Sequence, residues 1–253
     1  MTPKPISQRK CFIGSFHNHS TWSDGKYTPD ELVQKAIRLK YGSIGITDHY
    51  VTWKGNIHYV GNEQIEPYIK EIKNLNSKYG GIIRVFAGLE IDASTENPDR
   101  TKLPFAKLNK LDYVLFEYVD EYDDAFTLTD LIAIRNKLCC HVGLAHPNVK
   151  QLLDKYSAPG LATKLRDNNI FIDVCGSERN AIRGPYVRGN ISRQFALQIE
   201  GLGEEFEKEV RKHCVKFLPS SDTHYDNDND KMADAQIALR TIEDYKLSIL
   251  ELL

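Results

Sequence analysis

Short apolar runs alternate with amphipathic stretches over most of the chain. Short runs rich in Val, Ile, Leu and Phe are typical of buried strands, whereas apolar residues recurring every three or four positions are typical of helices. The predicted strands are Cys11–His17, Ser43–Thr47, Ile82–Ile91, Tyr113–Val119, Val142–Ala145, Ile170–Val174 and Val215–Pro219. The predicted helices are Pro29–Lys40, Glu63–Tyr79, Thr129–Leu138, Gly160–Asn168, Ser192–His213 and Ala233–Leu252.

The order of these elements predicts an α/β fold. Strand and helix alternate about seven times, which favours a parallel sheet with helices outside it. The first helix has a clear start, because Thr28 is a suitable N-cap, Pro29 suits the first helical position and Glu31 completes a capping box. No linker-like stretch divides the chain, so we expect one domain over residues 1–253, with a flexible segment at 1–10.

Composition narrows the class of protein. The 253 residues are 41% hydrophobic and 27% charged, as in ordinary globular proteins. A formal net charge of −2 disfavours nucleic acid as a partner. No stretch approaches the roughly 20 apolar residues of a membrane span, so a membrane partner is not expected.

The cysteines and the N-terminus bear on location. The five cysteines are an odd number without CxxC spacing, and most lie in apolar runs. The polar N-terminus has no apolar core of the kind that a signal peptide carries. We therefore expect reduced cysteines, mostly in the core, in a cytoplasmic protein.

Candidate chemistry begins at the first predicted strand. His17 and His19 are two residues apart, so on an extended backbone they face the same side. Two imidazoles on one side can bind one metal ion, and Asp24 follows five residues later. An isolated pair of this kind would more simply be two surface histidines.

Four further polar clusters make a metal site the better interpretation of this pair. In each, a histidine or a carboxylate lies at the end of an apolar strand, where the carboxyl ends of parallel strands converge. A carboxylate in so apolar a run as that around Glu90 is costly to bury unless it is paired or metal-bound. Convergent imidazoles and carboxylates indicate metal ions, and the mixed N and O donors suit Mn, Fe or Zn. The residues of these clusters are His49, Glu90, His146, Asp222 and His224.

The same clusters carry a family resemblance. The motifs HxHxxxxDG, TDH, GLE, AHP and SDTH occur in this order between His17 and His224. They resemble those of the polymerase and histidinol phosphatase (PHP) superfamily. The resemblance implies a distorted seven-stranded (β/α)7 barrel, similar to a TIM barrel, with two or three divalent metal ions at the C-terminal mouth of the strands. It also implies hydrolysis of phosphoester bonds.

Carried over motif by motif, the resemblance implies three metal positions. The first would be held by His17, His19, Glu90 and Asp222. The second would share Glu90 with His146, and the third would be held by Asp24, His49 and His224.

The chain departs from the family pattern at the fourth strand. Many members supply a further histidine there to the second metal, and this chain has none between Leu111 and Asp120. Glu117 ends the apolar run, and some members that resemble bacterial protein-tyrosine phosphatases have a Glu at that point. We therefore assign Glu117 as the replacement ligand.

A basic segment after the sixth strand offers phosphate contacts. Arg179 and Arg183 lie in it, and an arginine presents a planar fork of donors to a phosphate. An exposed loop with ordinary surface arginines explains the segment equally well.

These observations together predict a metal-dependent phosphatase. A metal-activated hydroxide would attack a phosphomonoester, so no catalytic residue is needed beyond the metal ligands. The expected substrate is a small phosphorylated metabolite, and the oligomeric state stays open. The alternatives are a histidinol-phosphate phosphatase, a protein-tyrosine phosphatase of the same fold, and a non-catalytic barrel that binds metal or a phosphorylated ligand.

Overall fold

The computed structural model describes residues 14–52, 54, 57–94, 102–176, 204–224 and 231–252. The described strands are β1 (Gly14–Ser15), β2 (Ser43–Tyr50), β3 (Arg84–Asp92), β4 (Tyr113–Glu117), β5 (His141–Leu144), β6 (Ile170–Cys175), β7 (Lys216–Ser220) and β8 (Ser248–Ile249). The described helices are α1 (Pro29–Arg38), α2 (Ile65–Tyr79), α3 (Phe105–Leu108), α4 (Leu128–Arg135), α5 (Val149–Lys155), α6 (Ala158–Asp167), α8 (Glu204–Lys212), the 3-10 helix η2 (Lys231–Asp234) and α9 (Ala235–Asp244).

All eight described strands are parallel neighbours in chain order, β1 to β8. The sheet curls until the chain just after β1 meets the chain at β7. Asn18 and Thr223 form an isolated parallel bridge, and the backbone N–H of Phe16 donates to the carbonyl of Pro219. The predicted α/β, TIM-barrel-like fold is confirmed, with one strand more than the seven expected.

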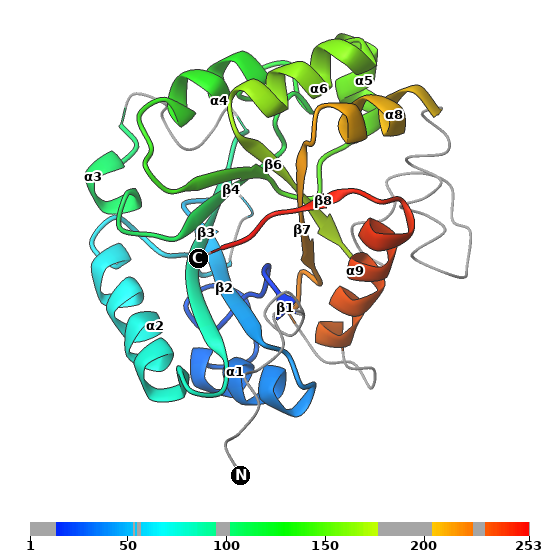
Figure 1. The fold of residues 1–253 in the computed structure, drawn as a ribbon. Helices are drawn as coiled ribbons and strands as arrows, with labels where there is room; N and C mark the ends of the chain where they lie inside the picture. The colour runs from blue at the N-terminus through cyan, green and yellow to red at the C-terminus, as the bar shows by residue number, and fades with distance from the viewer. Residues whose placement is uncertain are drawn as a thin grey trace.

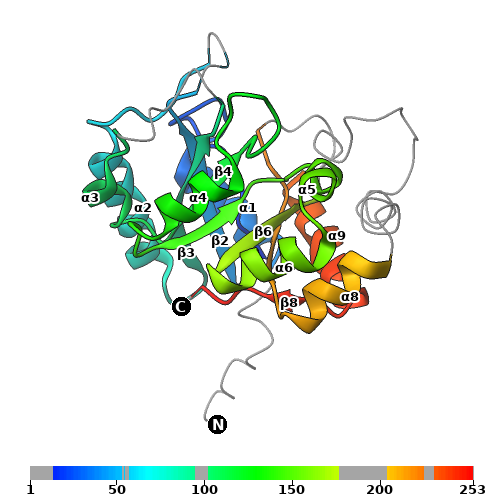
Figure 2. The ribbon, with the colours of Figure 1, turned by 90° about the horizontal axis from the view of Figure 1, so that it is seen from above.

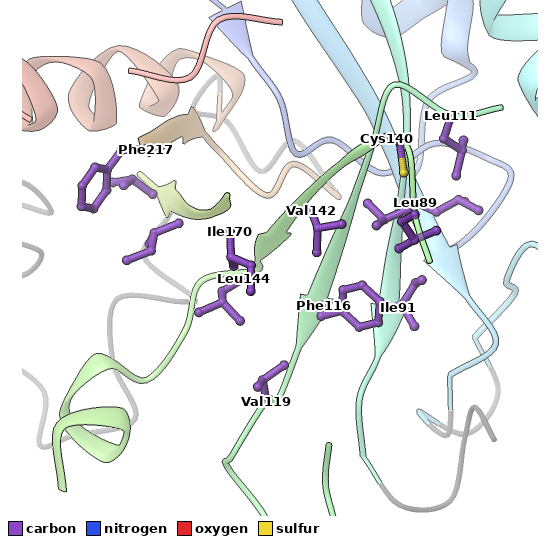
Figure 3. Close-up of a cluster of buried hydrophobic side chains, with 14 of the residues drawn as sticks. Leu89, Ile91, Leu111, Phe116, Val119, Cys140, Val142, Leu144, Ile170 and Phe217 are labelled. Atoms are coloured by element: carbon purple, nitrogen blue, oxygen red, sulfur yellow. The ribbon is translucent and has the colours of Figure 1, made fainter. Parts of the chain in front are cut away.

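The helices lie outside the curled sheet (Figures 1 and 2). The larger apolar cluster fills the layer between helices and strands, and Figure 3 shows part of it around Phe116, Val142 and Leu144. The predicted start of α1 is confirmed, because Thr28 and Glu31 form a reciprocal capping box around Pro29. This outer layer keeps the helices on the sheet and leaves the interior to a second set of side chains.

Strand alternation sends every second residue into the barrel interior. A smaller interior cluster contains Phe86 of β3, Tyr113 and Leu115 of β4, and Phe171 of β6. Two steps beyond Leu115 on the same face of β4 is Glu117, at the carboxyl end of that strand. The apolar residues therefore close the bottom of the barrel, and the same faces become polar toward its mouth.

The C-terminal segment differs from the prediction of one helix over 233–252. The helix α9 ends at Asp244, and Lys246 has a left-handed φ of 53°. The chain then forms β8 beside β7, and the N–H of Leu250 donates to the carbonyl of Phe217. The apolar residues after Lys246 suit a strand as well as a helix, and the edge of β7 supplies partners for their backbone.

Two smaller expectations also change. The helix predicted over 192–213 is described from Glu204 onward, and residues 192–203 lie outside the described residues. Four cysteines are described: Cys140 and Cys175 are buried, but Cys139 and Cys214 are exposed. Within the described part of the chain, no helix has the length and apolarity needed to cross a membrane.

The interior packing predicts the effect of one substitution. A Cβ on Gly88 would lie 2.5 Å from ring atoms of Tyr113, its partner in the β3–β4 register. Gly88→Ala should therefore lower the free energy of unfolding by about 1–3 kcal/mol in urea titration, because the ring cannot withdraw from the packed interior. Gly81→Ala is the control, since a Cβ there meets nothing within 4 Å and should change stability by less than about 0.5 kcal/mol. Equal effects of the two substitutions would contradict this prediction.

Candidate metal centre

The loop after β1 presents His17 and His19 to the interior. Both side chains are fully buried. Asn18 between them faces the barrel wall, where its amide donates to the carbonyls of Ser15 and Gly45. Fixing Asn18 in this way turns its two neighbours to the opposite side, as the two-residue spacing predicts.

A buried carboxylate holds the rest of the same loop. Asp48, at the end of β2, accepts hydrogen bonds from the backbone N–H and the hydroxyl of Ser20 and from the hydroxyl of Ser23. These contacts fix the chain immediately before Asp24. The TDH motif therefore contributes twice, because Asp48 shapes the loop and His49 faces the interior cluster.

The structure brings together all nine residues that were predicted as metal ligands. They come from the carboxyl ends of six strands and from the loops that follow them. Within each of four overlapping groups, one potential ligand atom per residue lies within 4.8 Å of the others. The groups are His19–Asp24–His49–His224, His17–Glu90–His146, His17–His19–Asp222 and His49–Glu90–Glu117.

The spacing in the first group suits a shared cation. Asp24 Oδ1 lies 3.3 Å from His224 Nε2, 3.6 Å from His49 Nε2 and 3.7 Å from His19 Nδ1. Nevertheless this buried oxygen has no hydrogen-bond partner, and neither does Nε2 of His49. Ligand atoms placed about 2.1 Å from one ion are separated by about 3.0–3.4 Å. Atoms at this spacing without hydrogen bonds to one another fit the donor set of a metal ion.

Glu90 lies at the centre of the other groups. Its carboxylate oxygens are 2.9 Å from His49 Nδ1, 3.1 Å from His146 Nε2 and 3.3 Å from His17 Nε2. Burial raises the pKa of this carboxyl, but His17 and His49 outweigh it and hold the pKa well below its usual range. Burial lowers the pKa of His146, and Glu90 more than compensates and raises it to about 9. Glu90 therefore stays an anion because cationic histidines surround it.

Glu117 joins the cluster through His49 and Glu90. Its Oε1 lies 3.8 Å from His49 Nδ1, and its Oε2 accepts a hydrogen bond from the ammonium of Lys54 at 2.8 Å. Burial, together with the charge of Glu90, raises the pKa of Glu117 to about 7. The expected partner of Glu117 in the second metal position was His146, whereas the grouping here pairs it with His49.

Asp173 is a residue of the site that the sequence motifs did not indicate. This residue of β6 is buried, and its Oδ2 lies 3.0 Å from His17 Nδ1. A carboxylate at that nitrogen favours the tautomer with the proton on Nδ1, which leaves Nε2 of His17 free to bind a metal. The signal was present in the sequence, since Asp173 is a lone carboxylate in the apolar run Ile170–Cys175.

Three of the nine ligand-type residues form the entrance to the cluster. The side chains of Asp24, His146 and His224 are 15–16% exposed, whereas those of the other six are at most 8% exposed. His146 and Asp222 have left-handed φ angles of 27° and 48°, a conformation that costs energy in residues other than glycine. The predicted phosphate contacts Arg179 and Arg183 lie outside the described residues.

Comparisons with known proteins agree with this arrangement. The model of the PHP domain family matches residues 15–209. The chain belongs to the PHP family. An uncharacterised relative, MJ1295 of Methanocaldococcus jannaschii, is 30% identical over 190 residues, which are 72% of this chain and 76% of the relative. The 5'-3' exoribonuclease Rnm of Escherichia coli is 34% identical over 85 residues, or 34% of this chain and 24% of Rnm.

A solved PHP structure shows the same fold. The histidinol phosphate phosphatase of Lactococcus lactis, complexed with zinc, L-histidinol and phosphate, superposes with a TM-score of 0.61. The superposition covers 94% of this chain and 95% of the phosphatase, at 14% sequence identity. The resemblance inferred from the five motifs is thus confirmed at the level of family and fold.

The contact between His17 and Asp173 predicts a change in metal affinity. Asp173→Asn should weaken the binding of one ion by about 10–100-fold, because an amide no longer enforces the correct tautomer of His17. Isothermal titration of the chelator-treated protein with Mn²⁺ or Zn²⁺ measures this. Asp112→Asn is the control, since that carboxylate accepts the N–H of Ala87 toward the opposite end of β3. Unchanged affinity in Asp173→Asn would show that His17 needs no such support.

A second prediction concerns pH in the chelator-treated protein. The pKa of His146 is about 9, against 6.5 for a free histidine, so between these values the folded chain holds a proton that the unfolded chain has released. The resulting stabilisation is full below pH 6.5 and is lost as the pH rises toward 9. Thermal unfolding should therefore begin at least a few degrees lower at pH 9 than at pH 7. A His146→Gln variant should show a smaller difference, and an unfolding temperature that rises with pH would contradict the assignment.

Proposed function

We propose that this chain is a metal-dependent phosphoesterase that hydrolyses a small phosphomonoester. The observation that carries the proposal is the convergence of nine N and O donors at the mouth of the barrel, within groups no wider than 4.8 Å. Membership of the PHP family supports the reaction class. The phosphatase and exoribonuclease activities named for two similar proteins support it further.

The residues present fit two or three divalent ions. One position would be held by Asp24, His49 and His224. The others would share Glu90, with His17, His19 and Asp222 on one side and His146 or Glu117 on the other. Such ions, when bound, lower the pKa of water to supply hydroxide near neutral pH and neutralise charge on phosphate oxygens.

The chain's own residues would hold and orient this centre. Asp173 presents Nε2 of His17 to the cluster, and Asp48 fixes the loop that carries Asp24. The more exposed Asp24, His146 and His224 mark the side from which a phosphate ester would approach. Arg179 and Arg183 remain our candidates for contacts to its oxygens.

Two similarities favour alternative substrates. A histidinol-phosphate phosphatase is the first alternative, favoured by the superposition over almost the whole chain. A nucleic-acid substrate is the second, favoured by the stretch similar to Rnm, while the net charge of −2 disfavours it. We keep a small phosphorylated metabolite as the proposed substrate and the cytoplasm as the proposed location.

Hydrolysis of an aryl phosphate tests the proposal directly. Chelator-treated protein should be inactive, and Mn²⁺ or Zn²⁺ should restore activity with two or three ions bound per chain. Asp222→Asn should lower kcat/KM by at least about 100-fold, because it weakens a ligand of the central positions. His141→Gln is the control, since this exposed residue begins β5 at the opposite end of the barrel.

Two results would contradict the proposal. The first is full activity in chelator, and the second is near-normal turnover by a folded Asp222→Asn variant. A screen of phosphorylated metabolites and of short oligonucleotides for released phosphate then separates the candidate substrates.

A further inference from the structure

Lys54 lies beside the candidate metal centre and is not one of its nine ligand-type residues. It follows β2, and its ammonium lies 2.8 Å from Glu117 Oε2 and 5.3 Å from the centre of the Tyr118 ring. The lysine side chain is 30% exposed, whereas the glutamate is fully buried. Among the residues that the structure describes, no lysine or arginine other than Lys54 forms an ion pair with one of the nine ligand-type residues.

The two carboxylate oxygens of Glu117 have different surroundings. Lys54 binds Oε2 from the solvent side. Oε1 is buried without a hydrogen-bond partner, and it faces His49 and Glu90. One oxygen is therefore committed to an ammonium, and the other is presented to the cluster.

We propose that Glu117 and Lys54 act together as one electrically neutral ligand for a metal ion. A second buried carboxylate next to Glu90 is costly unless a cation compensates it. With Lys54 attached, Glu117 still offers an anionic oxygen at short range, but the pair adds no net charge, as a neutral imidazole would add none. The inference rests on the proposed metal centre and names Lys54 as a positioning residue within it.

The effect of the Lys54 charge on ion binding therefore depends on whether Glu117 is present. An unpaired ammonium within a few ångströms of a divalent cation repels it, so Lys54 opposes ion binding unless the carboxylate balances it. Removing the carboxylate should consequently cost more affinity when Lys54 is present than when it is absent. A surface lysine that merely covers the cluster would show no such dependence.

A double-mutant cycle measures that dependence. Four chelator-treated proteins are titrated with Mn²⁺ or Zn²⁺ in a calorimeter without substrate: wild type, Glu117→His, Lys54→Met and the double variant. Glu117→His should weaken one ion by at least about tenfold, the scale of effects of residues that support metal ligands. In the Lys54→Met background, the fold loss of affinity caused by Glu117→His should be at least ten times smaller. Equal losses in the two backgrounds would overturn the proposal.

A control substitution at a second, similarly exposed lysine tests whether the effect is specific to Lys54. Lys107 is 27% exposed and contacts the carbonyl of Asn62 and the carboxylate of Glu63. Lys107→Met should leave the loss caused by Glu117→His unchanged, and an equal rescue by this substitution would overturn the proposal. If Glu117→His fails to fold by circular dichroism, the nearly isosteric Glu117→Gln takes its place in the cycle.

The experiment distinguishes this inference from the proposed function. A folded wild-type protein that takes up no ion overturns the metal centre and the inference together. Ion uptake with equal losses in both backgrounds overturns the inference alone. Coupled losses in a protein that hydrolyses no phosphoester support the inference and overturn the proposed function.

Discussion

The buried carboxylate of Glu90 is the group around which the mouth of the barrel is organised. Its oxygens lie 2.9–3.6 Å from ring nitrogens of four histidines, which come from β2 and from the segments after β1 and β5. An anion with 1% exposure persists only where cationic or metal partners offset its lost hydration. The geometry of four strands, β1, β2, β3 and β5, is therefore tied to a requirement for positive charge at one point.

Much of this arrangement was readable from the sequence because it is local. Alternation on a strand places Glu90 and Glu117 on interior faces, and the two-residue spacing of His17 and His19 does the same after β1. The contacts of Asp173 and Lys54 were not readable, because their partners lie 156 and 63 residues away. The end of α9 was also missed, since only the edge of β7, formed elsewhere, makes a strand of residues 248–249.

The fold and the substrate specificity depend on different parts of the chain. The barrel places the donor set at the carboxyl ends of its strands, and a solved structure with 14% sequence identity has the same fold. Specificity depends on the loops beyond those ends, where the sequence carries no periodic pattern to interpret. For this reason family membership supports the reaction class, and the leaving group has to be found by experiment.

Closure of the barrel and assembly of the donor set are one event. His17 and Asp222 meet only when the chain after β1 has joined the chain at β7, so an incompletely folded chain has no such set of donors to offer. Ions that bind only the closed form stabilise it in proportion to the logarithm of their free concentration. The supply of the ion would then govern how much folded protein persists in a cell, as well as how fast each molecule turns over.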